Sequence, residues 1–223
     1  MHAALGDPHR LAIVDALTVS DVAPSELCEI VGIESNLLAH HLDVLAEVGL
    51  LERFASHGDG RRRYVRLCRE VVATLVQPAR LTAANVVFVC TANSARSQLA
   101  AAMWNARHRV PAVSAGTAPA ERVHPQARRA AARRGLDLGG ASPTRLDDLE
   151  VEPDLVVTVC DRAHEQLRRR PIRFRRLVHW SIADPAERGT ARAFDEAADD
   201  LSRRVEELAS LFDPSSGAGE SPR

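Results

Sequence analysis

The chain has 223 residues, enough for one large domain or two small ones. With 45% hydrophobic and 26% charged residues, its composition excludes a collagen-like or wholly disordered chain. A formal net charge of -1 excludes a protein that coats nucleic acid through overall positive charge, but it permits a local basic patch. No run of about 18–20 apolar residues and no secretory leader is evident, and four dispersed cysteines make no disulfide framework. We therefore expect a cytoplasmic protein with no membrane partner.

The first region, residues 1–80, is predicted to contain short helices followed by a β-hairpin. Apolar periodicity and turn residues predict helices over about 7–19, 25–31 and 34–49. A glycine-rich turn at 57–60 separates two strand-like segments, which predicts the hairpin. This order is typical of a winged helix-turn-helix domain, in which the third helix enters the major groove of DNA.

The residues predicted to contact operator DNA lie on the third helix and at the hairpin tip. They are Ser35, Asn36, His40, His41, Arg61, Arg62 and Arg63. Three arginines alone would fit an ordinary solvated turn equally well, so the prediction rests on the whole pattern. Residues 1–80 contain eight arginines and eleven acidic residues, so electrostatic attraction to DNA must come from the hairpin.

Residues 5–75 resemble the arsenic-repressor (ArsR/SmtB) family of winged-helix regulators. The resemblance is carried by Asp7-Pro8-His9-Arg10-Leu11-Ala12-Ile13, Glu26-Leu27-Cys28 and His40-His41-Leu42-Asp43-Val44-Leu45 before Gly49-Leu50-Leu51. It implies a homodimer that leaves its operator when a metal or metalloid binds.

The family's arsenite sensors with a helix-borne site carry Glu-Leu-Cys-x-Cys, whereas Ile30 stands at the second cysteine position here. One thiolate cannot hold arsenite or zinc, which need three or four ligands. Cys28 and Cys68 stay candidate metalloid ligands, with a site built across a dimer as one arrangement. The alternative for Cys28 is a buried apolar cysteine.

The second region, residues 85–213, follows a linker predicted at 77–84 and precedes a tail, 214–223, predicted to be disordered. It alternates apolar strand segments with amphipathic helices. The predicted strands are 85–89, 112–117, 154–160 and 176–180, and the predicted helices are 98–107, 124–134 and 191–212. This pattern predicts the α/β class, with an open parallel sheet that binds its ligand at the carboxyl ends of the strands.

A Cys-x5-Arg-Ser motif, Cys90 to Ser97, joins the first of these strands to its helix. A tight loop at a helix N-terminus directs backbone N–H groups into its centre and binds an anion there. The predicted oxyanion-binding residues are Thr91, Ala92, Asn93, Ser94, Ala95 and Arg96. Cys90 would act as the nucleophilic thiolate, Ser97 would donate a hydrogen bond to it and Asn93 would pin the loop. The alternative is a buried cysteine beside a surface arginine.

Residues 85–212 resemble the low-molecular-weight tyrosine phosphatase fold, and within it the arsenate reductases. The motif just described, the segment Ser114-Ala115-Gly116-Thr117 and the pair Asp184-Pro185 carry the resemblance. It implies that Asp184 is the general acid, although an isolated Asp-Pro can be a mere turn.

Two further segments, Arg96-Ser97-Gln98-Leu99-Ala100 and His179-Trp180, look like the reductases. The phosphatases usually carry aromatic residues beside the acid loop. The sequence therefore favours arsenate over a phosphate ester as the substrate oxyanion.

Reduction of arsenate requires further thiols. Cys160 matches the second cysteine of the thioredoxin-coupled reductases, but their third cysteine has no counterpart in residues 161–167. Either Cys160 resolves the arsenic adduct or a small thiol does, and an inert Cys160 is the alternative. We expect no tightly bound cofactor and an external reductant: thioredoxin, glutathione or mycothiol with mycoredoxin. Two other functions stay open, a phosphatase with a phosphocysteine intermediate and a DNA-binding regulator with a non-catalytic oxyanion sensor.

Overall fold

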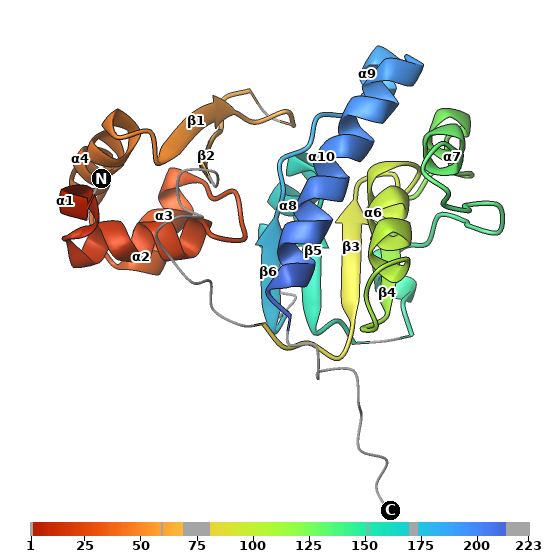
Figure 1. The fold of residues 1–223 in the computed structure, drawn as a ribbon, viewed down its shortest axis with the longest axis horizontal. Coiled ribbons are helices and arrows are strands. Elements are labelled where there is room, and N and C mark those ends of the chain that lie inside the picture. The colour runs from red at the N-terminus through yellow and green to blue at the C-terminus, as the bar shows by residue number, and fades with distance from the viewer. Residues whose placement is uncertain (1, 59, 69–80, 151, 170–173, 213–223) are drawn as a thin grey trace, which may run out of the picture. The chain divides into compact units, whose positions relative to one another are not determined.

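The computed structural model describes residues 2–58, 60–68, 81–150, 152–169 and 174–212. The chain forms two compact units, Met1–Pro78 and Ala79–Arg223 (Figure 1). The predicted linker lies partly, and the predicted tail wholly, outside the described residues. Among the helices that are described, none has the length and apolarity needed to cross a membrane.

The N-terminal unit has the predicted winged-helix order. Its elements are α1 (His2–Leu5), α2 (Pro8–Leu17), α3 (Pro24–Val31), α4 (Ser35–Glu47), β1 (Leu51–Ala55) and β2 (Arg63–Leu67). Asp7 caps α2 by accepting hydrogen bonds from the N–H groups of His9 and Arg10, at 2.9 and 3.1 Å. Gly32 ends α3 with φ of +73°, a conformation that favours glycine. The sequence analysis did not predict α1.

The predicted apolar stripe of α4 forms the core of this unit. Leu38, Leu42 and Leu45 are buried there against Leu27 of α3. The hairpin joins the core through two backbone hydrogen bonds between Val22 and Val65, at 3.0 and 2.9 Å. The wing is therefore fixed to the helices rather than projecting from them on a free turn.

The C-terminal unit is the predicted parallel α/β domain. Its four-stranded sheet has the order β4-β3-β5-β6, and every neighbouring pair is parallel. The strands are β3 (Val86–Cys90), β4 (Ala112–Gly116), β5 (Leu155–Thr158) and β6 (Arg176–His179). The helices are α6 (Arg96–Asn105), α7 (Pro125–Ala132), η1 (Leu146–Asp148), α8 (Asp161–Arg168), α9 (Pro185–Arg188) and α10 (Ala191–Ser210).

The central strand β3 organises the core of the domain. All five of its residues are buried, and Phe88 lies between Trp104 and Trp180 at ring-centroid distances of 6.1 and 5.8 Å. Helix α6 packs against β3, β4 and α10, and α8 packs against β3 and β5 (Figure 1). The sequence missed α8, α9 and η1, which are all shorter than nine residues.

Gly116 permits the close approach of β4 to the loop after β3. A Cβ atom at position 116 would lie 2.7 Å from the Thr91 carbonyl oxygen and 2.9 Å from Asn93 Cβ. The loop cannot move away easily, because the Thr117 N–H donates to the Cys90 carbonyl at 3.1 Å. Only glycine fits here without displacing the loop.

We predict that Gly116→Ala destabilises the C-terminal unit by about 1–3 kcal/mol, the typical cost of overpacking. Urea unfolding followed by tryptophan fluorescence measures this unit, because both tryptophans, Trp104 and Trp180, lie in it. Gly140→Ala is the matched control, since a Cβ there meets nothing within 4 Å. Equal midpoints for the two variants would contradict the prediction.

Candidate active site

Cys90 lies at the carboxyl end of β3, in the middle of the sheet. The residue is 2% exposed, and its strand pairs in parallel with β4 on one side and β5 on the other. Open α/β sheets bind ligands at this edge. The structure thus places the predicted nucleophile where the fold positions a ligand.

Asn93 holds the loop 91–95 in a tight, buried turn. It is the one described non-glycine residue with a positive φ, at +47°. Its Oδ1 accepts from the Thr144 N–H and its Nδ2 donates to Ser97 Oγ, both at 2.8 Å. Its own N–H donates to Cys90 Sγ at 3.2 Å. Asn93 therefore has the pinning role predicted for it and also directs an amide at the sulfur.

Ser97 and Gln98 complete the support of this loop. Ser97 Oγ lies 3.1 Å from Cys90 Sγ. Because Asn93 already donates to this oxygen, the hydroxyl proton can point to the sulfur, which stabilises a thiolate. Gln98 Nε2 donates to the Asn93 carbonyl and Oδ1 and to the Ser142 carbonyl, each at 3.1 Å. Gln98 was not predicted as a site residue, although it stands in the segment that resembles the reductases.

The carbonyl groups of the loop are bonded away from its centre. The carbonyls of Thr91, Ala92 and Ser94 accept from the N–H groups of residues 118, 120 and 124, at 2.8–2.9 Å. In a trans peptide the next N–H points the opposite way, so the following amides face inward. Helix α6 also lacks a side-chain cap at Ala95. The loop and the helix N-terminus together present N–H donors suited to an oxyanion.

Arg96 opens α6 and is 7% exposed. Its Nη1 donates to the Ile182 carbonyl at 2.8 Å and its Nη2 donates to Asp184 Oδ2 at 2.6 Å. Burial alone lowers the pKa of Arg96. Four neighbouring acidic groups outweigh this effect when they are ionised and raise that pKa: Cys160, Cys90, Asp184 and Asp161. The guanidinium is therefore a permanent buried cation at the mouth of the loop.

Asp184 follows β6 and caps α9, where its Oδ1 accepts from the Ala186 N–H at 3.0 Å. Its side chain is 35% exposed, and its contact with Arg96 brings it to the loop. The structure thus gathers Cys90, Arg96, Ser97 and Asp184 around one position, from segments that are up to 94 residues apart.

Cys160 also lies next to the loop 91–95. It follows β5, is 2% exposed and caps α8 by accepting from the Ala163 N–H at 3.4 Å. Its Sγ lies 3.5 Å from Thr91 Oγ1. Burial raises the pKa of the Cys160 thiol, and negative charge at Cys90 raises it further against the opposing effect of Arg96. Cys160 is therefore a buried, protonated thiol beside the anion loop.

A buried polar cluster under α8 was not predicted. Thr158 Oγ1 donates to the Val178 carbonyl at 3.2 Å and lies 3.2 and 3.0 Å from the Nδ1 atoms of His164 and His179. His179 Nε2 lies 3.2 Å from Asp161 Oδ1, the first residue of α8. The cluster fixes the helix that carries the second thiol. In the sequence, only the His179-Trp180 pair pointed to it.

The residues predicted to contact DNA differ in their exposure. Ser35, Asn36, His40, Arg61 and Arg63 are exposed, and Arg62 is half-buried.

His41 is 5% exposed and faces Asp7, so the structure does not support its predicted contact with DNA. Position 41 follows Leu38 by three residues and precedes Leu45 by four. This is the spacing of the buried face of a helix, which the apolar stripe could have revealed.

Cys28 and Cys68 are both half-buried and free of disulfides. Cys28 packs against the apolar core of the N-terminal unit, as its alternative interpretation predicted. Within the described part of one chain, neither cysteine belongs to a group of three metal-ligating side chains. A metalloid site built across a dimer stays a prediction.

Each of the two units matches a known protein family. Residues 85–214 match the family described as low molecular weight phosphotyrosine protein phosphatase, and residues 5–53 match the family described as helix-turn-helix domain. An arsenate reductase of Brevibacillus brevis is 32% identical over 127 residues, which cover 56% of this chain and 92% of that protein. An arsenate reductase of Bacillus subtilis is 32% identical over 133 residues, with coverage of 56% and 94%.

A solved structure shares the fold of the C-terminal unit. The low molecular weight protein tyrosine phosphatase from T. tengcongensis has a TM-score of 0.52 and 22% identity, covering 57% of this chain and 99% of that one. The family match spans more than half of the chain and includes the whole Cys-x5-Arg loop. The chain therefore belongs to the low molecular weight phosphotyrosine protein phosphatase family and carries a helix-turn-helix domain in front of the family's fold.

Proposed function

We propose that this protein couples a DNA-binding regulatory domain to an arsenate reductase whose nucleophile is Cys90. The position of Cys160 carries the proposal. It is a second buried thiol at the same anion loop, with its Sγ 3.5 Å from Thr91 Oγ1. Hydrolysis of a phosphate ester through a phosphocysteine needs no second thiol, whereas reduction of arsenate does. The similarity to the arsenate reductases of Brevibacillus brevis and Bacillus subtilis supports the same choice.

The first step of the proposed reaction forms a bond between sulfur and arsenic. The oxygens of arsenate are held by Arg96 and the amides of the loop, and the Cys90 thiolate attacks the arsenic atom. One As–O bond breaks, and Asp184 protonates the departing oxygen, which leaves as water. Arsenic is still As(V) in this adduct.

The second step transfers two electrons to arsenic. The Cys160 thiolate attacks the sulfur of Cys90, the S–As bond breaks, and its electron pair stays on arsenic, which leaves as arsenite, As(III). The two cysteines are oxidised to a disulfide. An external dithiol or a small thiol with its redoxin then returns both to thiols, so the proposed enzyme holds no bound cofactor.

The Arg96–Asp184 ion pair lets Asp184 change from a partner of Arg96 in the unliganded site to a general acid when the oxyanion binds. In the unliganded site the carboxylate holds Nη2 of Arg96. An incoming oxyanion competes for the same donor, because a guanidinium binds tetrahedral oxyanions through paired N–H groups. Once displaced from Arg96, Asp184 would lie beside the bound oxyanion, where a carboxyl group can deliver a proton to the departing oxygen.

A small oxyanion fits the surroundings of Asp184 better than an aryl ester does. Side chains that include Ile182, Pro185, Arg188 and Glu196 line a hollow beside this residue, and none of the described lining residues is aromatic. A phosphotyrosine site is expected to present aromatic side chains that stack on the substrate ring.

The primary test is the formation of arsenite from arsenate by the purified full chain, with thioredoxin, glutathione–glutaredoxin and mycothiol–mycoredoxin supplied separately. We expect turnover with at least one reductant. Cys160→Ser is expected to abolish that turnover but to retain hydrolysis of p-nitrophenyl phosphate, because only reduction uses the second thiol.

The matched control is Cys28→Ser, which removes a half-buried cysteine from the other unit and should leave both reactions unchanged. Brisk ester hydrolysis without arsenate turnover would show that the C-terminal domain is a phosphatase and not an arsenate reductase. Full arsenate turnover by Cys160→Ser would instead assign the second step to an external thiol.

Asp184→Asn tests the general acid. Asparagine still caps α9, so we expect an intact fold. Arsenate turnover should fall by about 10²–10⁴-fold, the usual contribution of a general acid. Hydrolysis of p-nitrophenyl phosphate should fall less, because p-nitrophenolate is a good leaving group that needs little protonation. Equal losses for both substrates would contradict the assignment.

We further propose that the N-terminal unit binds operator DNA as a homodimer, with α4 in the major groove and the β1–β2 turn on the phosphates. The exposure of Asn36 and His40 on α4, and of Arg61 and Arg63 at the turn, supports this placement.

Arg61→Ala and Arg63→Ala are expected to weaken binding to DNA from upstream of the gene. Each lost phosphate contact should reduce the slope of log K against log salt by about one. Fluorescence anisotropy across a salt series measures this slope. Arg129→Ala, an exposed arginine of the C-terminal unit, removes the same charge elsewhere and should leave the slope unchanged. If all three variants bind with the parental slope, the wing does not contact DNA.

A further inference from the structure

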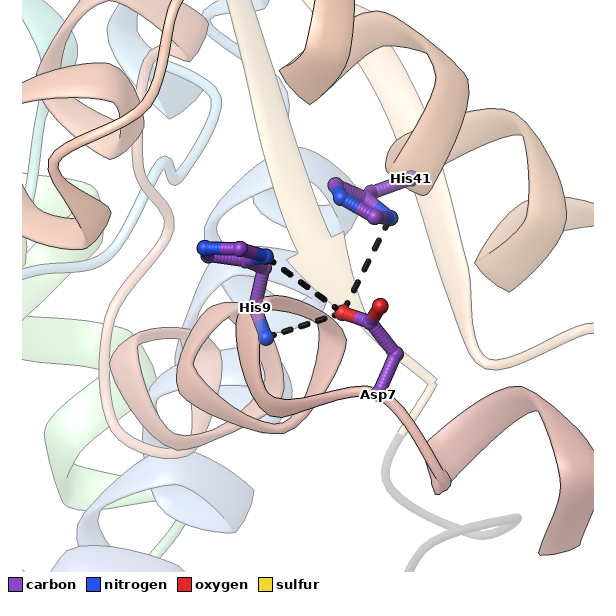
Figure 2. A group of neighbouring side chains, drawn as sticks. All are labelled: Asp7, His9 and His41. Atoms are coloured by element: carbon purple, nitrogen blue, oxygen red, sulfur yellow. Dashed lines mark hydrogen bonds and ion pairs between the residues drawn. The ribbon is translucent and has the colours of Figure 1, made fainter.

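Three side chains that can bind a metal ion lie close together in the N-terminal unit. The phosphatase-type site belongs to the C-terminal unit. Asp7 caps α2, His9 lies in its first turn, and His41 comes from α4 (Figure 2). One ligand atom from each lies within 4.8 Å of the other two, and no other described residues form such a group. Asp7 Oδ1 is 3.7 Å from His9 Nδ1 and 4.0 Å from His41 Nδ1.

His41 is the residue that points to a ligand. Its side chain is 6% exposed, and neither ring nitrogen has a hydrogen-bond partner among the described residues. Buried polar atoms are nearly always paired, because burial without a partner costs free energy. The 4.0 Å separation from Asp7 is too long for a hydrogen bond. Figure 2 shows the imidazole turned toward this carboxylate.

The surroundings of Asp7 and His41 shift their pKa values in the direction that favours metal binding. Burial lowers the pKa of His41, and the charge of Asp7 opposes this only in part. Hydrogen bonds from the backbone N–H groups of Arg10 and His9 lower the pKa of Asp7 against the effect of burial. A neutral imidazole and a carboxylate are the ligand forms of these side chains.

We propose that Asp7, His9 and His41 bind a divalent transition-metal ion of the zinc class, which ties the start of α2 to α4. Zinc takes imidazole nitrogen and carboxylate oxygen at about 2.0–2.2 Å, so neighbouring ligand atoms of a tetrahedral site lie about 3.3 Å apart. The two separations from Asp7 Oδ1, 3.7 and 4.0 Å, would contract by less than 1 Å on binding, and the imidazole nitrogens would come together from at most 4.8 Å. Water would fill the fourth position, as in other three-ligand zinc sites.

The nearest cation does not block the site. The guanidinium of Arg10 donates from Nε to the Ala4 carbonyl and from Nη2 to the Ala3 carbonyl. These bonds commit it to α1. Its positive charge still acts on His41, so we expect moderate affinity rather than the tight binding of a closed structural site. This metal site requires neither arsenate reduction nor DNA binding by the chain.

The test is metal binding by the reduced, metal-free full chain. Zinc affinity is measured by competition with a chromogenic chelator, and Co²⁺ serves as the spectroscopic probe. We expect one equivalent of Co²⁺ with visible d–d bands and without the thiolate-to-cobalt charge-transfer band that a cysteine site would give. Zinc should also raise the melting temperature of the N-terminal unit, because a ligand that binds only the folded state stabilises it.

His9→Gln, Asp7→Asn and His41→Gln should each weaken zinc binding by at least about 10-fold. Loss of a residue that only supports a metal ligand already costs about 10- to 100-fold in affinity, so loss of a ligand should cost no less. Asparagine preserves the cap of α2, and His9 is 44% exposed, so both of those variants should stay folded. His40→Gln, at the adjacent exposed position of α4, is the matched control and should bind normally. Parental affinity in folded His9→Gln and Asp7→Asn, or no binding by the parent chain, would overturn the proposal.

Discussion

The buried guanidinium of Arg96 is the constraint around which the phosphatase-type site is built. A cation at 7% exposure costs several kcal/mol unless nearby anions and carbonyl groups compensate it. The fold surrounds it with the carboxylate of Asp184, the carbonyl of Ile182 and two thiols that can ionise. Under the proposed function, an incoming oxyanion would replace Asp184 as the anion that compensates this charge. The requirement to balance one buried charge therefore shapes the resting site and favours an anionic ligand.

This constraint also explains which parts of the site can be predicted from sequence. Cys90, Arg96 and Ser97 lie on one short strand–loop–helix segment, so their spacing alone fixes their relation. The contacts that support this segment come from distant parts of the chain. The Thr144 N–H donates to Asn93, and Gly116 packs closely against the same loop. No local pattern marks such contacts. Asp184 could be assigned only through family resemblance, because its approach to Arg96 depends on the register of the sheet.

The features that the sequence misplaces or misses are buried polar residues. His41 is predicted to contact DNA, although its spacing from Leu38 and Leu45 places it on the buried face of α4. Likewise the cluster of Thr158, His164 and His179 lies in segments that are otherwise apolar or short. Buried polar residues break the correspondence between polarity and exposure, and they tend to do so where a side chain has a specific partner.

The charges at the site also impose an order on the two thiols of the proposed reaction. Burial keeps Cys160 protonated, and negative charge on Cys90 adds to this effect while Arg96 opposes it. As long as Cys90 is a thiolate, ionising the second cysteine would place two negative charges beside one cation. In the proposed reaction the S–As bond would shift charge from the Cys90 sulfur to the arsenate oxygens, which Arg96 and the loop amides would hold. Cys160 would therefore stay protonated while the Cys90 thiolate attacks, so the second thiol would not compete with the first for the oxyanion.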